Sequence, residues 1–141
     1  MVSKKQYHFI KNFARKMEGL VLIAFDENKA VIEDMNTDQL WSGKRSDGKS
    51  LPNYSPVSVA VYGKPPGAIR LYDEGDFYAG IQATAGADGV VIEGTDGKTD
   101  ELETMYGTEI IGLTEENKNE LQENYIKPTL QRIILKLHGK S

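Results

Sequence analysis

The sequence predicts an α+β fold in which helices at both ends of the chain flank a small antiparallel β-sheet. Apolar residues recur at helical spacing near both termini, and two alternating stretches meet at the turn sequence GADG (86–89). Strands and helices do not follow one another in the alternating order that is typical of a parallel sheet. With 141 residues, the chain is expected to form a single domain, 1–141.

The first 40 residues are predicted to form two helices. Ser3 is expected to cap a helix that runs to about Glu18, and Gly19 is expected to mark a corner after it. A second long helix is expected from Leu20 to Leu40, because apolar residues recur there three or four positions apart. The run GLVLIAF at its start also suits a buried strand, since short apolar runs fit both structures.

Residues 42–70 are predicted to be an extended arm that includes a strand. Glycines, prolines and serines dominate residues 42–56 and indicate a loop. The alternation of VSVAVY (57–62) predicts a strand, which GKPPG (63–67) ends, and AIRLY (68–72) is expected to be a short extended piece. We expect this arm to reach a neighbouring subunit rather than to cover its own core.

The C-terminal part is predicted to be helical. A short helix is expected over KTDELETMYG, with Thr99 as its cap and Gly107 as its end. Thr114 is expected to cap a long helix whose first turn carries two glutamates, which suit the helix dipole. Pro128 lies within this helix and predicts a kink, and Gly139 is expected to end it.

The composition excludes several kinds of site. The chain has no cysteine, which removes disulfides, thiolate zinc sites and cysteine nucleophiles. The net charge of −4 argues against a dedicated nucleic-acid binder, and no apolar run is long enough to span a membrane. A soluble, intracellular protein is therefore expected. Residues 1–17 and 127–141 carry basic side chains and no acidic ones, which predicts either solvated helix faces or a basic contact with another subunit.

The sequence contains no motif for catalysis or nucleotide binding. The chain lacks a G-x-S-x-G elbow, and its two histidines, His8 and His138, lie near the termini. The stretches YGKPPGAIR and SGKRSDGKS lack the Walker spacing, and TDGKTDELE lacks the EF-hand spacing. The Asp-Gly pairs are therefore interpreted as turns, and neither a cofactor nor a metal is expected.

The stretch LYDEGDFYAG (71–80) crowds carboxylates and aromatic rings around one glycine. Asp73 and Asp76 could serve a glycosidase, but they lie too close in sequence to flank a sugar by themselves. An acidic turn at Gly75 is the favoured interpretation, with the aromatic residues in the core or in a seam between subunits. The single tryptophan, Trp41, is expected to anchor the loop that follows it or to contact a partner.

Several pieces of the chain, in their order and spacing, resemble the virion-morphogenesis and tail-completion (neck) proteins of tailed bacteriophages, in particular those of crass-like phages. The matching pieces are QLWSG, SDGKSL, YSP, LYDEGDFYAGI, YG and IIGLTEENKNEL, and the resemblance covers roughly residues 28–135. One departure is Glu74, where related proteins often carry a threonine that could close the turn. In that family, the segment around residues 110–113 is a short strand before a capped helix. The positions that carry the resemblance are Gln39, Leu40, Trp41, Gly43, Gly48, Tyr54, Lys64, Leu71, Gly75, Phe77, Tyr78, Gly107, Gly112 and Leu113.

The resemblance implies a non-enzymatic protein that assembles with itself into a ring of six or twelve copies. Such a ring joins the connector (portal side) of the capsid to tail proteins, and DNA passes through its lumen without sequence-specific binding. The expected location is therefore the neck or tail of the virion, after synthesis in the cytoplasm of the host bacterium. Two alternatives stay open: a protein-binding adaptor or regulatory module, and a carbohydrate-active enzyme that uses Asp73 or Asp76 with an acid elsewhere in the chain.

Overall fold

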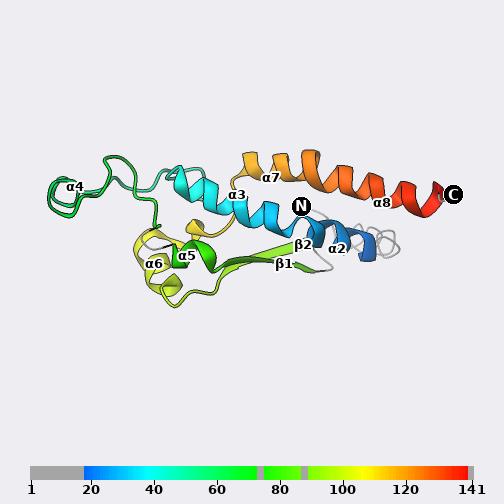
Figure 1. The fold of residues 1–141 in the computed structure, drawn as a ribbon, viewed down its shortest axis with the longest axis horizontal. Coiled ribbons are helices and arrows are strands. Elements are labelled where there is room, and N and C mark those ends of the chain that lie inside the picture. The colour runs from blue at the N-terminus through cyan, green and yellow to red at the C-terminus, as the bar shows by residue number, and fades with distance from the viewer. Residues whose placement is uncertain (1–17, 73–74, 87–88, 140–141) are drawn as a thin grey trace, which may run out of the picture.

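The computed structural model describes residues 18–72, 75–86 and 89–139, and it confirms the α+β fold class (Figure 1). The helices are α2 (Glu18–Glu27), α3 (Lys29–Trp41), α4 (Pro56–Tyr62), α5 (Asp76–Ala79), α6 (Thr99–Tyr106), α7 (Glu115–Leu121) and α8 (Lys127–Gly139). The strands are β1 (Ile81–Gly86) and β2 (Gly89–Gly94). A 3₁₀ turn, η2 (Thr108–Ile110), and a π-helical turn, η3 (Gln122–Ile126), complete the elements.

The two strands form an antiparallel hairpin, as predicted, with Ile81 paired to Gly94 and Gly86 paired to Gly89. The two residues at the tip of its turn, 87–88, lie outside the described residues. Side chains alternate at the start of β1, so that Ile81 and Ala83 are buried and Gln82 and Thr84 are exposed. Helices α2 and α3 pack on the buried face, and in Figure 1 they lie between the sheet and the C-terminal helix.

The single helix predicted from Leu20 to Leu40 is wrong in one respect, because the chain breaks at Asn28 into α2 and α3. The amide nitrogen of the Asn28 side chain donates to the carbonyl oxygen of Ala24 over 2.8 Å. Such a local side-chain bond competes with the regular helical bond, which explains the break. The corner expected at Gly19 is also wrong, since Gly19 lies within α2. The helix predicted from Ser3 falls almost entirely in residues 1–17, outside the described residues.

The C-terminal helix has the expected cap and the expected irregularity. The Thr114 hydroxyl accepts a hydrogen bond from the backbone N–H of Asn117 over 3.1 Å, which satisfies one free donor of the first turn. The kink expected at Pro128 takes the form of the π-helical turn η3, which lies immediately before it. Because α7, η3 and α8 follow one another without a break, Pro128 lies inside a continuous helix, and the wider turn of η3 accommodates its ring and its missing N–H.

Two smaller predictions in the C-terminal half need correction. Thr99 is the first residue of α6 rather than its cap, and its hydroxyl is buried without a hydrogen-bond partner among the described residues. The short strand implied around residues 110–113 is replaced by η2 and an irregular segment. Gly107 ends α6 as predicted, with a positive φ of 95° that favours glycine.

The core consists of two clusters of buried side chains. The first lies between α2, α3, the sheet and the C-terminal helix and contains Ala24, Ile32, Ala83, Leu113, Leu121 and Ile126. The second lies beneath the point at which the arm leaves the body and contains Leu40, Leu51, Leu71, Phe77, Ile81 and Ile110. In the part of the chain that is described, none of the helices has the length and apolar character needed to cross a membrane.

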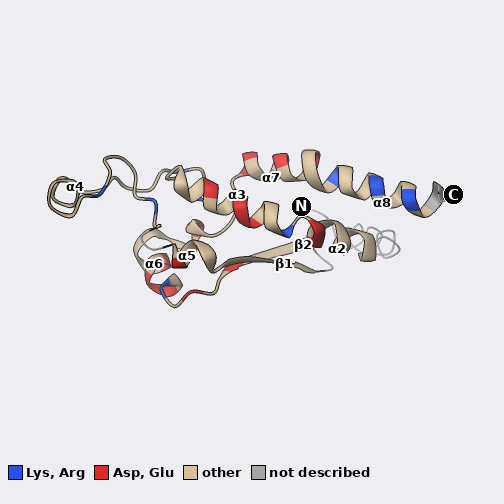
Figure 2. Ribbon diagram, in the orientation of Figure 1, with Lys and Arg blue, Asp and Glu red and all other residues tan. Residues whose placement is uncertain are grey.

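Of the two basic terminal segments predicted from the sequence, the structure describes only the C-terminal one. Lys127, Arg132 and Lys136 lie along α8, as the blue segments of Figure 2 show. Arg132 pairs with Glu27 of α2, with 2.5 Å between Nη2 and Oε2. The basic residues of 1–17 lie outside the described residues.

Candidate functional site

The most distinctive feature of the molecule is the arm (residues 42–70), which projects from the body and carries α4 at its far end (Figure 1). Helix α4 buries none of its residues. Three of its large side chains are strongly exposed: Val57 by 60%, Val61 by 67% and Tyr62 by 72%. Apolar side chains gathered on a projection gain nothing from their own chain, so this helix is the first candidate for contact with another molecule.

The arm corrects the strand predicted over 57–62, since Pro56–Tyr62 forms a helix. Local signals explain this outcome. Ser55 caps the helix by accepting a hydrogen bond from the Ser58 N–H over 3.1 Å, and Pro56 occupies the first helical position, where its fixed φ is favourable. Gly63 ends the helix in the left-handed conformation. No strand of the described chain lies beside this segment, so its β-branched residues have no sheet to join.

The stalk of the arm is formed by two extended segments that pair side by side. The Tyr54 N–H donates to the Gly67 carbonyl over 2.9 Å, and the Ile69 N–H donates to the Pro52 carbonyl over 2.8 Å. An isolated bridge joins Asn53 to Ala68, so the extended piece predicted over 68–72 is confirmed only at its start. The Lys64 ammonium nitrogen lies 5.8 Å from the centre of the Tyr54 ring. These bonds hold the two segments together and let α4 stand away from the body.

The root of the arm depends on Gly43, which follows α3 with a φ of 77°. A Cβ atom at this position would lie 2.5 Å from the Cβ of Ala68, so only glycine allows the two ends of the arm to meet here. The Gly43 carbonyl also accepts a hydrogen bond from the Leu51 N–H over 2.7 Å. Gly48, in contrast, serves a turn with a φ of 82° and has open space around it.

A turn over Lys44–Ser50 fastens the root to the body through Arg45. Its guanidinium pairs with Asp47 and donates to the Tyr106 carbonyl over 3.0 Å. The Nη1 atom of Arg45 also lies 3.8 Å from the Oε1 atom of Glu109. The hydrogen bond and charge of Arg45 lower the pKa of the Asp47 carboxyl. The sequence analysis did not single out Arg45, and only the dense turn signals of its segment pointed to this region.

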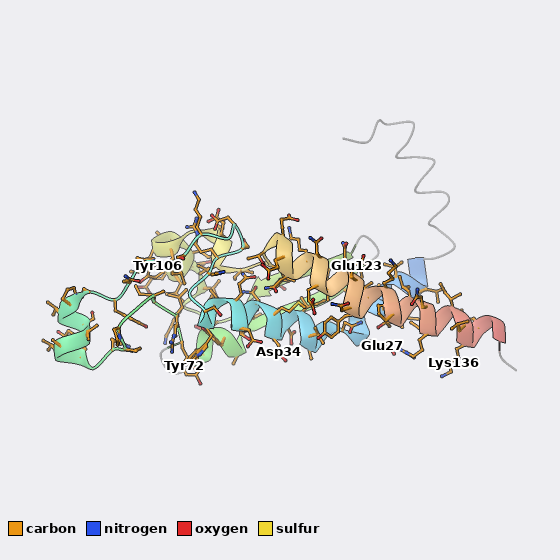
Figure 3. The ribbon with its side chains drawn as sticks, turned by 90° about the horizontal axis from the view of Figure 1, so that it is seen from above. Glu27, Asp34, Tyr72, Tyr106, Glu123 and Lys136 are labelled. Atoms are coloured by element: carbon orange, nitrogen blue, oxygen red, sulfur yellow. The ribbon has the colours of Figure 1, made fainter. Side chains whose placement is uncertain are left out.

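An aromatic cluster lies where the arm rejoins the body. The rings of Trp41, Tyr72 and Tyr78 meet edge to face, with centroid separations of 5.4 Å, 6.5 Å and 5.1 Å. The Arg70 guanidinium lies 4.4 Å from the centre of the Trp41 ring, a cation–π contact. Figure 3 shows Tyr72 at the junction of arm and body. Trp41 and Tyr72 remain 48% and 44% exposed, so this cluster offers a second surface suited to a protein partner.

The turn within LYDEGDFYAG is built as the sequence predicted at Gly75, whose φ is 86° and which precedes α5. Phe77 is buried in the second core cluster, and the Tyr78 hydroxyl donates to the Arg70 carbonyl over 2.7 Å. Burial raises the pKa of the Tyr78 hydroxyl. Leu71 is the single residue other than glycine with positive φ among those described, at 59°. The stretch therefore closes the arm against the core.

The carboxylates of the same stretch add no support for an enzyme. Asp76 lies exposed in the first turn of α5. Asp73 and Glu74 lie outside the described residues. Within the described ranges, no three histidine or acidic side chains gather as a metal site would require. The carbohydrate-active alternative therefore stays a hypothesis.

Two buried amides fix the loop after α6 to helix α3. Asn36 donates to the Ile110 carbonyl over 3.2 Å and accepts from the Gly112 N–H over 2.8 Å. Gln39 donates to the Gly112 carbonyl over 3.0 Å and accepts from the Thr114 N–H over 2.9 Å. Among the described residues, the backbone groups of this loop have no neighbouring strand to pair with. The two amide side chains supply their hydrogen bonds instead, as an adjacent strand would in a sheet. Asn36 was missed by the sequence analysis, because partners 74 and 76 residues away leave no local signal.

An apolar groove opens on the body between α2, β2 and the start of the C-terminal helix. It has a volume of about 350 Å³ and is lined by Phe25, Val90, Ile92, Leu113, Leu121 and Gln122, among others. Its floor is continuous with the first core cluster, since Leu113 and Leu121 belong to that cluster. Of the positions that carry the family resemblance, Gly112 and Leu113 line this groove.

The remaining resemblance positions gather mainly around the arm. Gln39, Leu40 and Trp41 end the helix that leads into it, and Leu71, Phe77 and Tyr78 close its return. Gly107 approaches the root turn, because a Cβ atom there would lie 3.1 Å from a guanidinium nitrogen of Arg45. No protein-family model matches the chain, and searches of curated proteins and of solved structures find no match either.

Proposed function

We propose that this protein is a structural subunit of a ring in the neck or tail of a tailed bacteriophage. The ring joins the capsid connector to the tail and surrounds the channel through which DNA passes. Six or twelve copies form it, and the subunit has no catalytic activity of its own. The observation that carries the proposal is the arm, whose terminal helix α4 exposes apolar side chains and buries none on its own chain.

The arm supports assembly because its geometry is suited to bridging two molecules. Its stalk is held by backbone hydrogen bonds, and its root is fixed by Gly43 and Arg45. A projection with a fixed root loses little conformational freedom when it binds, so more of the contact energy becomes affinity. The resemblance to phage neck proteins supports the virion context, since four of its fourteen positions lie in the arm and seven more lie within nine residues of its ends.

A protein-binding adaptor is the alternative that the same arm supports, because an exposed apolar helix also suits an unrelated protein groove. The two functions differ in where the protein is found. A ring subunit is retained in mature particles, whereas a regulatory adaptor is left behind in the lysate.

The test is the location of the protein. Mass spectrometry of particles purified through a density gradient is expected to detect the chain at several copies per portal, and electron microscopy is expected to place it at the neck or tail. Absence from purified particles, with abundant protein in the lysate, would overturn the proposal and favour the adaptor. Light scattering after gel filtration then measures whether the isolated chain self-associates.

A further inference from the structure

The arm and the apolar groove are complementary surfaces that a single chain does not bring together. In Figure 1 the arm projects from one end of the molecule, whereas α2 and β2, which border the groove, lie toward the other end. Helix α4 has no buried residue, so it contacts no groove of its own chain. Among the described residues, no segment of the same chain covers α4 or fills the groove, so both surfaces are open to another molecule.

The tip of the arm is apolar, as is most of the lining of this groove. Residues 50–63 carry no charged side chain. Val57 and Val61 are one helical turn apart, so they share one face of α4, and both are more than half exposed. The groove presents Phe25 and Ile92 to an incoming side chain, with the buried Leu121 in its floor and Lys118 as the one charged residue of its lining. Seating the two valines there removes apolar surface from water on both partners.

Charge complementarity favours another copy of this chain as the second molecule. Residues 42–70 carry five basic side chains and one acidic side chain, a net charge of +4. Residues 18–41 and 71–141 together carry seven basic and twenty acidic side chains, a net charge of −13. In Figure 2 the acidic residues are spread over α3, α6 and α7. The body of one copy therefore attracts the arm of the next, which favours association between like chains.

We propose that α4 of one copy docks in the apolar groove of a second copy, with Val57 and Val61 as its anchors. This inference rests on the proposed ring function and names the surface at which neighbouring subunits meet. The contact is heterologous, because the arm and the groove are different surfaces. Repeating it adds copies in one direction, and the series closes as a ring when the rotation between copies divides a full turn.

The absence of natural cysteines allows a direct test by cross-linking. Two single variants, Val61→Cys in the arm and Gln122→Cys at the groove, are purified separately, mixed, and treated with a short bis-maleimide. Docking is expected to give a covalent dimer that contains one copy of each variant. The matched control is Asn124→Cys, an exposed amide two residues further along η3 that lines a different surface depression, together with Glu120 and Glu123.

The mixture with Gln122→Cys is expected to cross-link several-fold more than the mixture with Asn124→Cys. Equal yields in the two mixtures would overturn the inference. So would a yield from Val61→Cys alone that matches the mixture, since arms would then pair with arms. Absence of any cross-link at the highest soluble concentration would overturn it as well.

The double variant Val61→Cys/Gln122→Cys extends the test to the whole assembly. A closed ring is expected to give a ladder of covalent species that stops at the number of copies in the ring. Failure of the inference and failure of the proposed function are distinguishable. Protein that is present in virions but cross-links without preference for the groove retains the ring and loses the docking surface. Selective cross-linking by a protein that is missing from virions retains the docking surface and loses the phage ring.

Discussion

Asn28 donates a hydrogen bond from its side-chain nitrogen to the hydroxyl oxygen of Thr129 over 3.0 Å, although 101 residues separate them. Asn28 lies at the break between α2 and α3, and Thr129 lies just after the π-helical turn. The Thr129 hydroxyl in turn donates to the Tyr125 carbonyl over 2.6 Å. The two irregular points of the helical layers are therefore joined, so the bend of the C-terminal helix faces the break between α2 and α3.

Replacing Asn28 by alanine is expected to lower the free energy of unfolding by about 2 kcal/mol, because it removes two hydrogen bonds from a buried side chain. In this variant the Thr129 hydroxyl still donates to the Tyr125 carbonyl, but it no longer accepts a hydrogen bond from Asn28. Urea denaturation followed by circular dichroism measures the loss. Asn119→Ala, at an exposed position of α7, is the control and is expected to change stability little. Equal midpoints for the two variants would contradict the prediction.

Replacing Gly43 by alanine is expected to destabilise the protein more than the same change at Gly48. Both residues have positive φ, so both substitutions impose backbone strain of about 1 kcal/mol. A Cβ atom at position 43 also meets Ala68 at 2.5 Å, whereas one at position 48 meets open space. The difference between the melting temperatures of Gly43→Ala and Gly48→Ala therefore measures the cost of the contact with Ala68. The double variant Gly43→Ala/Ala68→Gly is expected to recover part of the loss, and a double variant no better than Gly43→Ala would refute this explanation.

Replacing Val57 and Val61 by serine is expected to weaken self-association and leave the stability of the monomer unchanged. Helix α4 buries no residue, so its side chains contribute little to the folded monomer. The Ser55 cap and Pro56 remain and preserve the start of the helix. Sedimentation equilibrium is expected to show at least about a tenfold rise in the dissociation constant, since each buried valine contributes more than about 1.4 kcal/mol.

The control for that experiment is Val91→Ser, at a position of β2 that is 65% exposed and is not among the groove residues. It removes a comparable exposed valine from another surface. Association that is weakened equally by Val91→Ser would show that general loss of apolar surface, rather than docking of α4, caused the effect.

The pair formed by Arg45 and Asp47 is expected to make the root of the arm sensitive to acid. Arg45 lowers the pKa of the Asp47 carboxyl in the folded protein. A lowered carboxyl pKa stabilises the fold above the unfolded-state value of about 3.9, and that contribution is lost as pH falls through the lower, folded-state pKa. Titration of the Asp47 carboxyl by NMR is expected to show this lowered midpoint, and Arg45→Gln is expected to return it toward the ordinary value. An unchanged midpoint in Arg45→Gln would contradict the assignment.

The features that the sequence predicted correctly are those with a local signal. The hairpin follows from the turn at 86–89 between alternating stretches, and Thr114 caps its helix through a residue three positions away. The irregularity before Pro128 follows from the missing N–H of that residue. In each case the residues that decide the structure lie within one turn of one another, so no knowledge of the tertiary fold was needed.

The features that the sequence did not predict depend on partners far along the chain or on the lack of a partner. The strand expected over 57–62 needed a neighbouring strand, and without one the cap at Ser55 and the proline after it favour a helix. The bonds of Asn36 to the loop after α6 span more than 70 residues and leave no periodic pattern. The groove likewise gathers residues from α2, β2, the segment 112–113, α7 and η3. Gly112 and Leu113 were named for the resemblance alone, and the structure places both in the lining of this groove.

The paired stalk between Asn53 and Ala68 works as a spacer of fixed length. It holds α4 at a set distance from the body. In the proposed ring, this distance would determine how far apart neighbouring copies lie, so the radius of the ring and the width of its lumen would depend on the number of residue pairs in the stalk. Lengthening the stalk by one pair on each side would widen the opening without altering either surface that makes the contact.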